Sequence, residues 1–222
     1  MAKVLLDDKT YRIVPTHFPT ISLFESCLDP TELQDAYLLE GLTNDRLQDS
    51  IGELLMVAEE DRVTGPGTTP IMASFTHFGQ ASRFTNGDFG VYYAALDLDT
   101  AVEETKFWQA RLLKASNEPE MTRDMRVYCS NLLPSVGALV DLRNDDSVHD
   151  LDDYGYAQGV AADLRSQREY GIFYRSVRHQ GGECVAVVRP PILSPTIQSV
   201  SLRYYWDGTK ISRVERVSTY GS

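Results

Sequence analysis

The stretch Ser82–Trp108 reads SRFTNGDFGVYYAALDLDTAVEETKFW and predicts a turn, a strand and the start of a helix. The Asn-Gly pair at 86–87 predicts the turn, because both residue types tolerate positive φ. The run Val91–Leu96 predicts a strand of β-branched, aromatic and small residues. Successive side chains on a strand point to opposite faces, so only one of Tyr92 and Tyr93 can face a given pocket.

A helix is expected after this strand, because an apolar stripe recurs at helical spacing. The stripe consists of Ala101, Thr105, Trp108 and Leu112. Residues 100–103 fit a capping box, in which Thr100 accepts from the Glu103 amide and Glu103 reaches back to the cap. Glu103 then points away from the stripe, whereas Glu104 lies at its edge, near the positive end of the helix dipole. We therefore expect Glu103 to be structural and Glu104 to be aimed into a cleft.

Arg83 and Glu104 flank this turn–strand–helix unit, and two interpretations are open at this point. They can form an ordinary surface ion pair, or they can share a binding site.

The composition excludes several classes of protein. A chain of 222 residues with 42% apolar and 24% charged residues is typical of a globular protein, and we expect one domain over residues 1–222. A net charge of −11 argues against direct nucleic-acid binding, which draws its affinity from Lys and Arg. Because no apolar run reaches membrane-spanning length and the N-terminus is not a signal peptide, we expect no membrane association and a cytoplasmic location.

Neither the cysteines nor the histidines predict a metal site. The cysteines are few and widely spaced: Cys27, Cys129 and Cys184. We expect them to be reduced core residues. The histidines are equally scattered, at His17, His77, His149 and His179, and show no metal-ligand spacing. The acidic segment 144–153 lacks the glycine and terminal glutamate of a calcium loop and is expected to be a solvated turn or helix entry.

The N-terminal third predicts mixed elements. Residues 10–15 predict a strand stopped by Pro15, residues 30–39 a helix, and residues 71–75 a strand. Arg12 lies between apolar neighbours in the first strand. Its stem can pack along the surface with the guanidinium in water, or it can be a second cation for the same pocket as Arg83.

The C-terminal half predicts further strands at 125–132 and 138–142, a helix at 157–170 with Gly171 as C-cap, and two hairpins. One hairpin turns at the glycines near residue 181 and the other at Asp207-Gly208. Ser176, on the first of these, can be a buried donor or can line a site. The expected architecture is α+β, with a mixed or antiparallel sheet and flanking helices, because no βαβ alternation is present.

Four polar positions and their surroundings resemble the RES domain. They are Arg83 in SRF, Tyr93 in GVYYAA, Glu104 in TAVEET and Ser176 in GIFYRSVRHQGGECVAV. The opening YRIVPTHFP, with TNDR and SFTHFGQASRF, resembles the longer branch that includes the ParT-type toxins. The resemblance runs from about Arg12 to Val188, and it suggests that residues 1–70 are a family-specific N-terminal extension packed on the core.

The resemblance implies a toxin of a type II toxin–antitoxin pair, with an ADP-ribosyltransferase-like fold and NAD+ as its substrate. Members of the family differ in the acceptor of ADP-ribose: some use water or phosphate, and ParT-like members modify a protein involved in nucleotide synthesis. The expected partners are therefore an antitoxin protein that blocks the pocket and a target protein, with no metal cofactor.

The residue types fit that chemistry. Cleavage of the nicotinamide–ribose bond builds positive charge on the ribose, which a fixed carboxylate such as Glu104 can stabilise. Arg83 is expected to hold the pyrophosphate with help from Arg12, Tyr93 to stack on the nicotinamide or ribose, and Ser176 to position the ribose or the supporting hydrogen bonds. A glycosidase acting on ordinary sugars needs a second facing carboxylate that the sequence does not offer. A non-enzymatic protein-binding domain is the other alternative.

Overall fold

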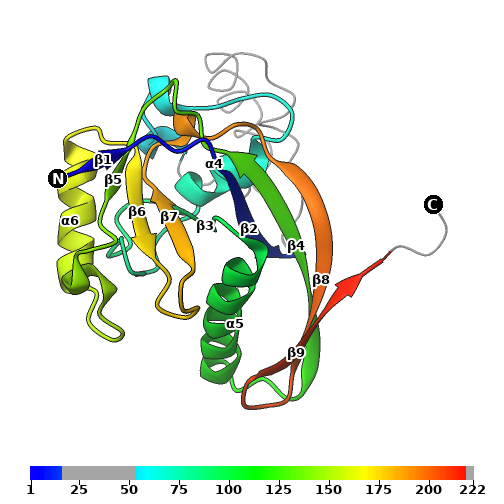
Figure 1. Ribbon diagram of the computed structural model, residues 1–222. Helices are drawn as coiled ribbons and strands as arrows, with labels where there is room; N and C mark the ends of the chain where they lie inside the picture. The colour runs from blue at the N-terminus through cyan, green and yellow to red at the C-terminus, as the bar shows by residue number, and fades with distance from the viewer. Residues whose placement is uncertain (17–53, 219–222) are drawn as a thin grey trace.

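A computed structural model of the chain describes residues 1–16 and 54–218. Within them, nine strands form one sheet: β1 (Lys3–Val4), β2 (Lys9–Pro15), β3 (Tyr92–Ala95), β4 (Met121–Asn131), β5 (Leu139–Asp141), β6 (Gly171–Arg175), β7 (Glu183–Val187), β8 (Ile197–Trp206) and β9 (Ile211–Val217). The order across the sheet is β1-β5-β6-β7-β3-β2-β4-β8-β9 (Figure 1). Neighbouring strands are antiparallel except β5 and β6, which are parallel.

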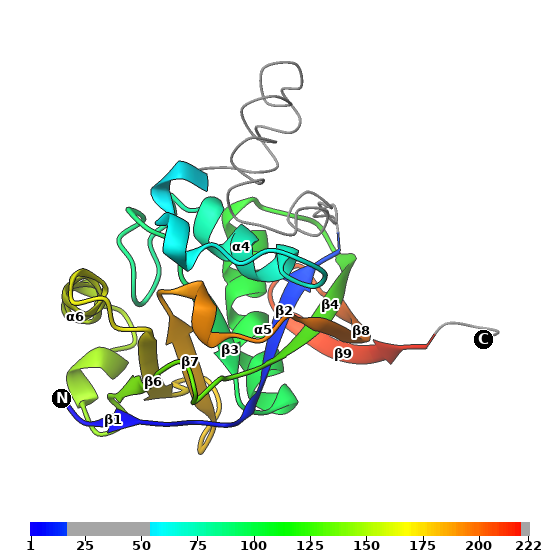
Figure 2. The same cartoon turned by 90° about the horizontal axis from the view of Figure 1, so that it is seen from above.

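Three α-helices accompany the sheet in the described residues: α4 (Thr69–Thr76), α5 (Leu98–Ala115) and α6 (Gly155–Ser166). Short 3-10 turns lie at η1 (Leu54–Met56), η2 (Glu59–Asp61), η3 (Asp146–His149) and η4 (Pro190–Ile192). Seen from above, α6 lies on the β1 side and β9 forms the opposite edge (Figure 2). The predicted α+β class, with a mixed and mostly antiparallel sheet, is confirmed.

Two apolar cores cover the two faces of the sheet. On β6, Ile172 and Tyr174 point to the core that contains residues of α5 and α6, whereas Phe173 points to the core that contains α4. The same alternation separates Tyr92, which is fully buried on the α4 face, from Tyr93, which packs on the α5 face. The prediction that these two tyrosines face opposite ways is therefore confirmed.

The sheet is split between β2 and β3. Strand β2 pairs with β4 along its whole length, from Lys9 to Pro15, but its register with β3 consists of one pair, Tyr11 opposite Ala95. From Arg12 onward, the edge of β2 that faces β3 is therefore not part of a ladder. This opening in the middle of the sheet is where the candidate site lies.

The strand predicted at 71–75 is wrong, because these residues belong to α4. Pro70 lies in the first helical turn, where its missing N–H costs nothing, and the amides of Ile71 and Met72 both donate to the Thr68 carbonyl. Ile71, Met72 and Phe75 then share one buried face against the sheet. The segment forms a helix, although several of its residues favour strands, because its apolar residues recur at helical spacing.

The capping box predicted at 100–103 is also wrong, because α5 begins three residues earlier. Asp97 is the N-cap, and its carboxylate accepts the Thr100 amide at 2.7 Å. Glu103 instead forms an ion pair with Lys106 at 2.8 Å. The predicted apolar stripe is wrong at its last residue, because Leu112 is 48% exposed and Leu113 is fully buried instead. A helix that starts earlier and packs slightly rotated accounts for both differences.

The predicted C-cap at Gly171 is wrong as well. Helix α6 ends at Ser166, the left-handed residue that follows is Arg168 with φ 60°, and Gly171 is the first residue of β6. A Cβ on Gly171 would lie 2.4 Å from the Ala186 carbonyl oxygen, so a glycine is needed for close strand packing.

The remaining strand and hairpin predictions are confirmed by β2, β3, β4, β5, β6–β7 and β8–β9. The acidic segment 144–153 contains η3 and turns. The helix predicted at 30–39 and Cys27 lie outside the described residues. The division at residue 70 stays a prediction, and β2, from the N-terminal side of it, is an inner strand of the sheet.

Over residues 1–16 and 54–218, no group of three or more acidic, histidine or cysteine side chains is placed to hold a metal ion. None of the helices in the same ranges has the length and apolar character that crossing a bilayer requires. Cys129 and Cys184 are buried free thiols, as expected of core residues.

Candidate active site

A hollow of about 260 Å³ lies at the split in the sheet, and we call it the Glu104 hollow. Its walls come from β2, β3, β6, β7, α5 and the turn around residues 80–83. Four of the five residues predicted from the sequence line it: Arg12, Arg83, Tyr93 and Glu104. The fifth, Ser176, lines a neighbouring hollow and contacts Glu104 from behind. The four predicted residues that line the hollow, which lie up to 92 positions apart in the chain, are therefore brought to one place.

Glu104, in the second turn of α5, is held by one hydrogen bond of fixed direction. The Ser176 hydroxyl donates to Glu104 Oε1 at 2.6 Å. That hydroxyl also accepts the backbone amides of Arg178 at 3.1 Å and His179 at 2.9 Å. Because both amides can only donate, the hydroxyl hydrogen points to the carboxylate. Glu104 Oε2 makes no hydrogen bond to a described residue, which leaves it available to a ligand.

The loop that carries Ser176 is attached to the start of α5. Thr100 Oγ1 donates to Asp97 Oδ2 at 2.6 Å and lies 2.7 Å from His179 Nδ1. Since the hydroxyl hydrogen is used by Asp97, Nδ1 is the donor in the second bond. A Cβ on Gly182 would lie 2.4 Å from Thr100 Oγ1, so the hairpin comes as close to the helix as a glycine allows. The N-cap of α5 thus fixes the position of Ser176.

Arg83 is buried, with 7% of its surface exposed, and is held by neutral groups. Its Nη1 donates to the carbonyls of Val148 at 2.8 Å and Asp150 at 2.7 Å, and its guanidinium lies 4.7 Å from the centre of the Tyr154 ring. Among the described residues it forms no ion pair with Glu104, so the surface-pair interpretation is not what the structure shows. Arg83 lines the hollow and forms no ion pair with any carboxylate of the described residues.

Tyr93 connects β3 to the turn that carries Arg83. Its hydroxyl lies 2.8 Å from Ser82 Oγ and accepts the Phe84 amide at 2.9 Å. Burial raises the pKa of Tyr93 to about 12, so the phenol stays protonated at physiological pH. The side chain forms a wall of the hollow and, through Ser82 and Phe84, holds the residues on both sides of Arg83.

Arg12 reaches through the split between β2 and β3. Its Nη1 donates to the Tyr93 carbonyl at 3.1 Å, and its guanidinium lies 4.8 Å from the centre of the Tyr92 ring. Burial lowers the pKa of Arg12, opposed by the two tyrosines. Arg12 is half-buried and lines the hollow, so the structure places it beside the predicted pocket, and its role as a second cation there stays a prediction.

Arg178 also lines the Glu104 hollow and was not predicted from the sequence. Its guanidinium lies 3.5 Å from the centre of the Phe107 ring, on the same helix as Glu104. Its place two residues after Ser176 is the only signal in the sequence, because the contact depends on how the hairpin loop docks on α5. Of the described residues that line the hollow, Glu104 is the sole carboxylate, beside three arginines.

The chain is similar to known proteins over most of its length. A protein of Sinorhizobium fredii, strain NBRC 101917 / NGR234, named "Uncharacterized protein y4oC", is 28% identical over 216 residues, which is 96% of this chain and 89% of that protein. A chain in the crystal structure of the M. tuberculosis MbcT-MbcA toxin–antitoxin complex is similar at a TM-score of 0.48 and 13% identity, over 89% of this chain and 86% of that chain. The family model described as "RES domain" matches residues 59–207, more than half of the chain, so the protein belongs to the RES family.

Proposed function

We propose that this RES protein consumes NAD+ by cleaving the bond between nicotinamide and ribose, and that it is the toxin of a toxin–antitoxin pair. The observation that carries the proposal concerns the described residues that line the hollow. They include one carboxylate, which Ser176 holds in place, and three arginines that form no ion pair with it. In a chain with a net charge of −11, such a hollow favours an anionic substrate whose reacting centre becomes positive. A dinucleotide with a pyrophosphate and a cationic nicotinamide has both properties.

The reaction breaks the C–N bond to nicotinamide, and the bonding electron pair leaves with the nicotinamide ring. Positive charge then develops on the ribose, and the free oxygen of Glu104 stabilises it or accepts a hydrogen bond from a ribose hydroxyl. Nicotinamide leaves as a neutral molecule, so no strong general acid is needed. The acceptor oxygen forms the new bond to the ribose carbon and loses its proton to solvent.

The other side chains bind and orient in this proposal. Arg83 and Arg12 hold the pyrophosphate, because their contacts to carbonyls and rings leave their charge available. Tyr93 packs against the nicotinamide or the ribose. Ser176 acts through Glu104 as a positioning residue, since its hydroxyl is directed at the carboxylate.

We propose a protein as the acceptor of ADP-ribose, on the ParT-like opening segment of the sequence. The second candidate is water or phosphate, for which access to the hollow is enough. Labelled NAD+ incubated with a cell lysate separates the two, because a labelled protein band forms only by transfer. Free ADP-ribose or its phosphate without a labelled band would favour the second candidate.

Nicotinamide release by the purified protein incubated with NAD+ tests the reaction itself. We expect release by the wild type, and growth arrest when the protein is expressed without its antitoxin. An absence of nicotinamide release, with or without lysate, would contradict the proposal and would favour a protein-binding domain.

A further inference from the structure

A second and larger hollow adjoins the Glu104 hollow, and we call it the α4 hollow. Its volume is about 1020 Å³, and it extends from the split in the sheet to α4 and to the strands β4 and β8. The two hollows share part of their walls: Arg12, Ile13, Gln80, Ser82 and Tyr93 line both. They are therefore adjacent compartments that meet at the opening between β2 and β3.

The Glu104 hollow is too small to enclose a whole dinucleotide. Pockets that bury most of a drug-sized ligand have volumes of about 300 to 1,000 Å³, and the Glu104 hollow, at about 260 Å³, lies below that range. It can take the end of the substrate that reacts. The rest of the molecule needs a continuation, and the shared wall leads into the α4 hollow.

The α4 hollow has the chemistry of a nucleotide site. None of the described residues that line it is a carboxylate, although the chain has 32 acidic residues. The half-buried ring of Phe78 supplies apolar surface, to which the buried Phe89 and Tyr128 add less, and the amides of Gln80 and Gln198 supply hydrogen-bond donors and acceptors. A purine base needs both kinds of contact, and an adjoining phosphate is best placed where no acid repels it.

Arg12 stands at the junction of the two hollows. Its guanidinium is held by a carbonyl and a ring, and its buried Nε makes no hydrogen bond to a described residue. A cation at the junction is where the phosphates of a substrate that spans both compartments would lie.

We propose that the α4 hollow binds the adenosine half of the dinucleotide, with the phosphates at Arg12 and the nicotinamide riboside in the Glu104 hollow. This inference rests on the proposed function for the identity of the substrate. It adds the direction in which the substrate lies across the sheet. It also assigns a binding role to α4, whose residues were predicted from the sequence to be a strand.

Binding of AMP, measured by calorimetry, tests the assignment without requiring turnover. AMP carries the adenosine and one phosphate but no nicotinamide. Ala73→Trp fills the α4 hollow from a half-buried position on α4, and Gln198→Trp fills it from an exposed position at its rim, where folding is not at risk. Ala162→Trp, on the exposed side of α6 and outside both hollows, is the matched control.

We expect AMP to bind the wild type, Ala162→Trp and Glu104→Gln with similar affinity, and to bind Ala73→Trp and Gln198→Trp about tenfold more weakly or worse. The KM for NAD+ should rise in the same two variants. No AMP binding by the wild type at millimolar concentration, or equal binding by both filled variants and the control, would overturn the assignment. Nicotinamide release by the wild type together with such a result would leave the proposed function standing, whereas AMP binding without release would sink only the proposed function.

Discussion

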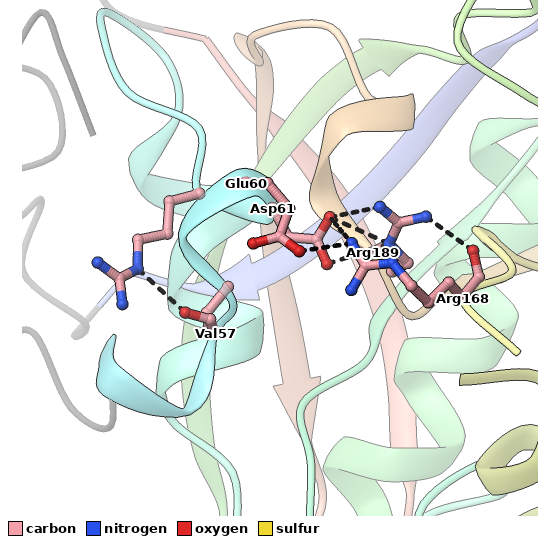
Figure 3. A network of polar contacts seen from close by, with 6 residues as sticks. Val57, Glu60, Asp61, Arg168 and Arg189 are labelled. Atoms are coloured by element: carbon pink, nitrogen blue, oxygen red, sulfur yellow. Dashed lines mark hydrogen bonds and ion pairs between the residues drawn. The ribbon is translucent and has the colours of Figure 1, made fainter. Parts of the chain in front are cut away.

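Arginines occur in two kinds of surroundings in this molecule, and the difference separates structure from function. In the network formed by Glu60, Asp61, Arg168 and Arg189, both guanidiniums meet carboxylates (Figure 3). Arg189 donates to Asp61 through Nε at 3.0 Å and Nη2 at 2.7 Å, and these hydrogen bonds raise the pKa of Arg189. The network ties η2 to the loop after α6 and to the end of β7, and its charges cancel locally.

In the Glu104 hollow the guanidiniums meet neutral groups instead. Arg83 contacts two carbonyls and the Tyr154 ring, and Arg12 contacts one carbonyl and the Tyr92 ring. Carbonyl oxygens and ring faces hold a cation in place without cancelling its charge. Arg189, paired with a carboxylate, therefore stabilises the fold, whereas the positive charge of Arg83 and Arg12, held by carbonyls and rings, remains available to attract an anionic ligand.

Removing the carboxylate from the paired network should give the largest effect on stability. Asp61→Ala leaves Arg189, whose side chain is 14% exposed, buried without its partner, and we expect a loss of about 3–5 kcal/mol in the free energy of unfolding. Urea unfolding measures it. Glu60→Ala is the control, because Glu60 is 62% exposed and its ion pair should contribute about 0.5 kcal/mol or less. Similar losses for both variants would show that burial does not distinguish the two pairs.

Removing the hydroxyl behind Glu104 should affect catalysis more than stability. Ser176→Ala deletes the hydrogen bond to Glu104 Oε1, and a hydrogen bond to a charged group of about 1.5–3 kcal/mol predicts a fall in kcat of about 10- to 100-fold with little change in KM. Ser176→Thr keeps the hydroxyl and should recover most of the rate. Nicotinamide release measures both. Full activity of Ser176→Ala would mean that Glu104 is oriented by other groups.

Crowding the contact between the hairpin and α5 should cost somewhat less. Gly182→Ala places a Cβ against the Thr100 side chain, which is β-branched and already bonded to Asp97, and we expect a destabilisation of about 1–3 kcal/mol. Gly159→Ala, on the exposed face of α6 with open space around it, should instead stabilise by about 0.5–1 kcal/mol. Thermal unfolding compares the two. The same sign for both changes would contradict the close docking of the hairpin.

The smallest effect is expected at Tyr92, on the side of the sheet away from the Glu104 hollow. Its buried hydroxyl makes no hydrogen bond to a described residue, so Tyr92→Phe should be neutral or stabilising by about 1 kcal/mol at pH 7. Burial, opposed by the charge of Arg12, raises the pKa of Tyr92 from 10.0 to about 12.

A raised pKa means that the folded protein favours the protonated form of Tyr92. The free energy of unfolding is therefore unaffected by this titration below pH 10 and falls as the pH rises from 10 to 12. Tyr92 should account for about 3 kcal/mol of that alkaline loss, and Tyr92→Phe should lack it. Urea unfolding across this pH range measures the difference. Parallel curves for the wild type and the variant would show that Tyr92 does not titrate as described.

The sequence predicted the elements that local patterns decide. The alternation of Tyr92 and Tyr93, the turn at 86–87 and the glycine hairpins follow from period and φ preference alone. The predicted convergence of Arg83, Tyr93 and Glu104 on one hollow came from the resemblance together with helix geometry, and all three line the hollow.

What the sequence did not predict depends on tertiary contacts. Asp97, and not Thr100, is the N-cap of α5. The Thr100 hydroxyl instead contacts His179 of the hairpin. The contacts of Arg178 and Tyr154 with the site depend on how loops distant in sequence dock, which no local pattern encodes. The split between β2 and β3 is likewise a matter of strand pairing, which the pattern of either strand leaves open.

Nicotinamide release from NAD+ by Glu104→Gln and Glu103→Gln, measured side by side, tests the account most directly. The two residues are neighbours on α5, but Glu104 lines the hollow and Glu103 pairs with Lys106 outside it. We predict that Glu104→Gln loses about 10²- to 10³-fold in kcat and that Glu103→Gln stays within about twofold of the wild type. Release at the wild-type rate by Glu104→Gln, or an equal loss in both variants, would contradict it.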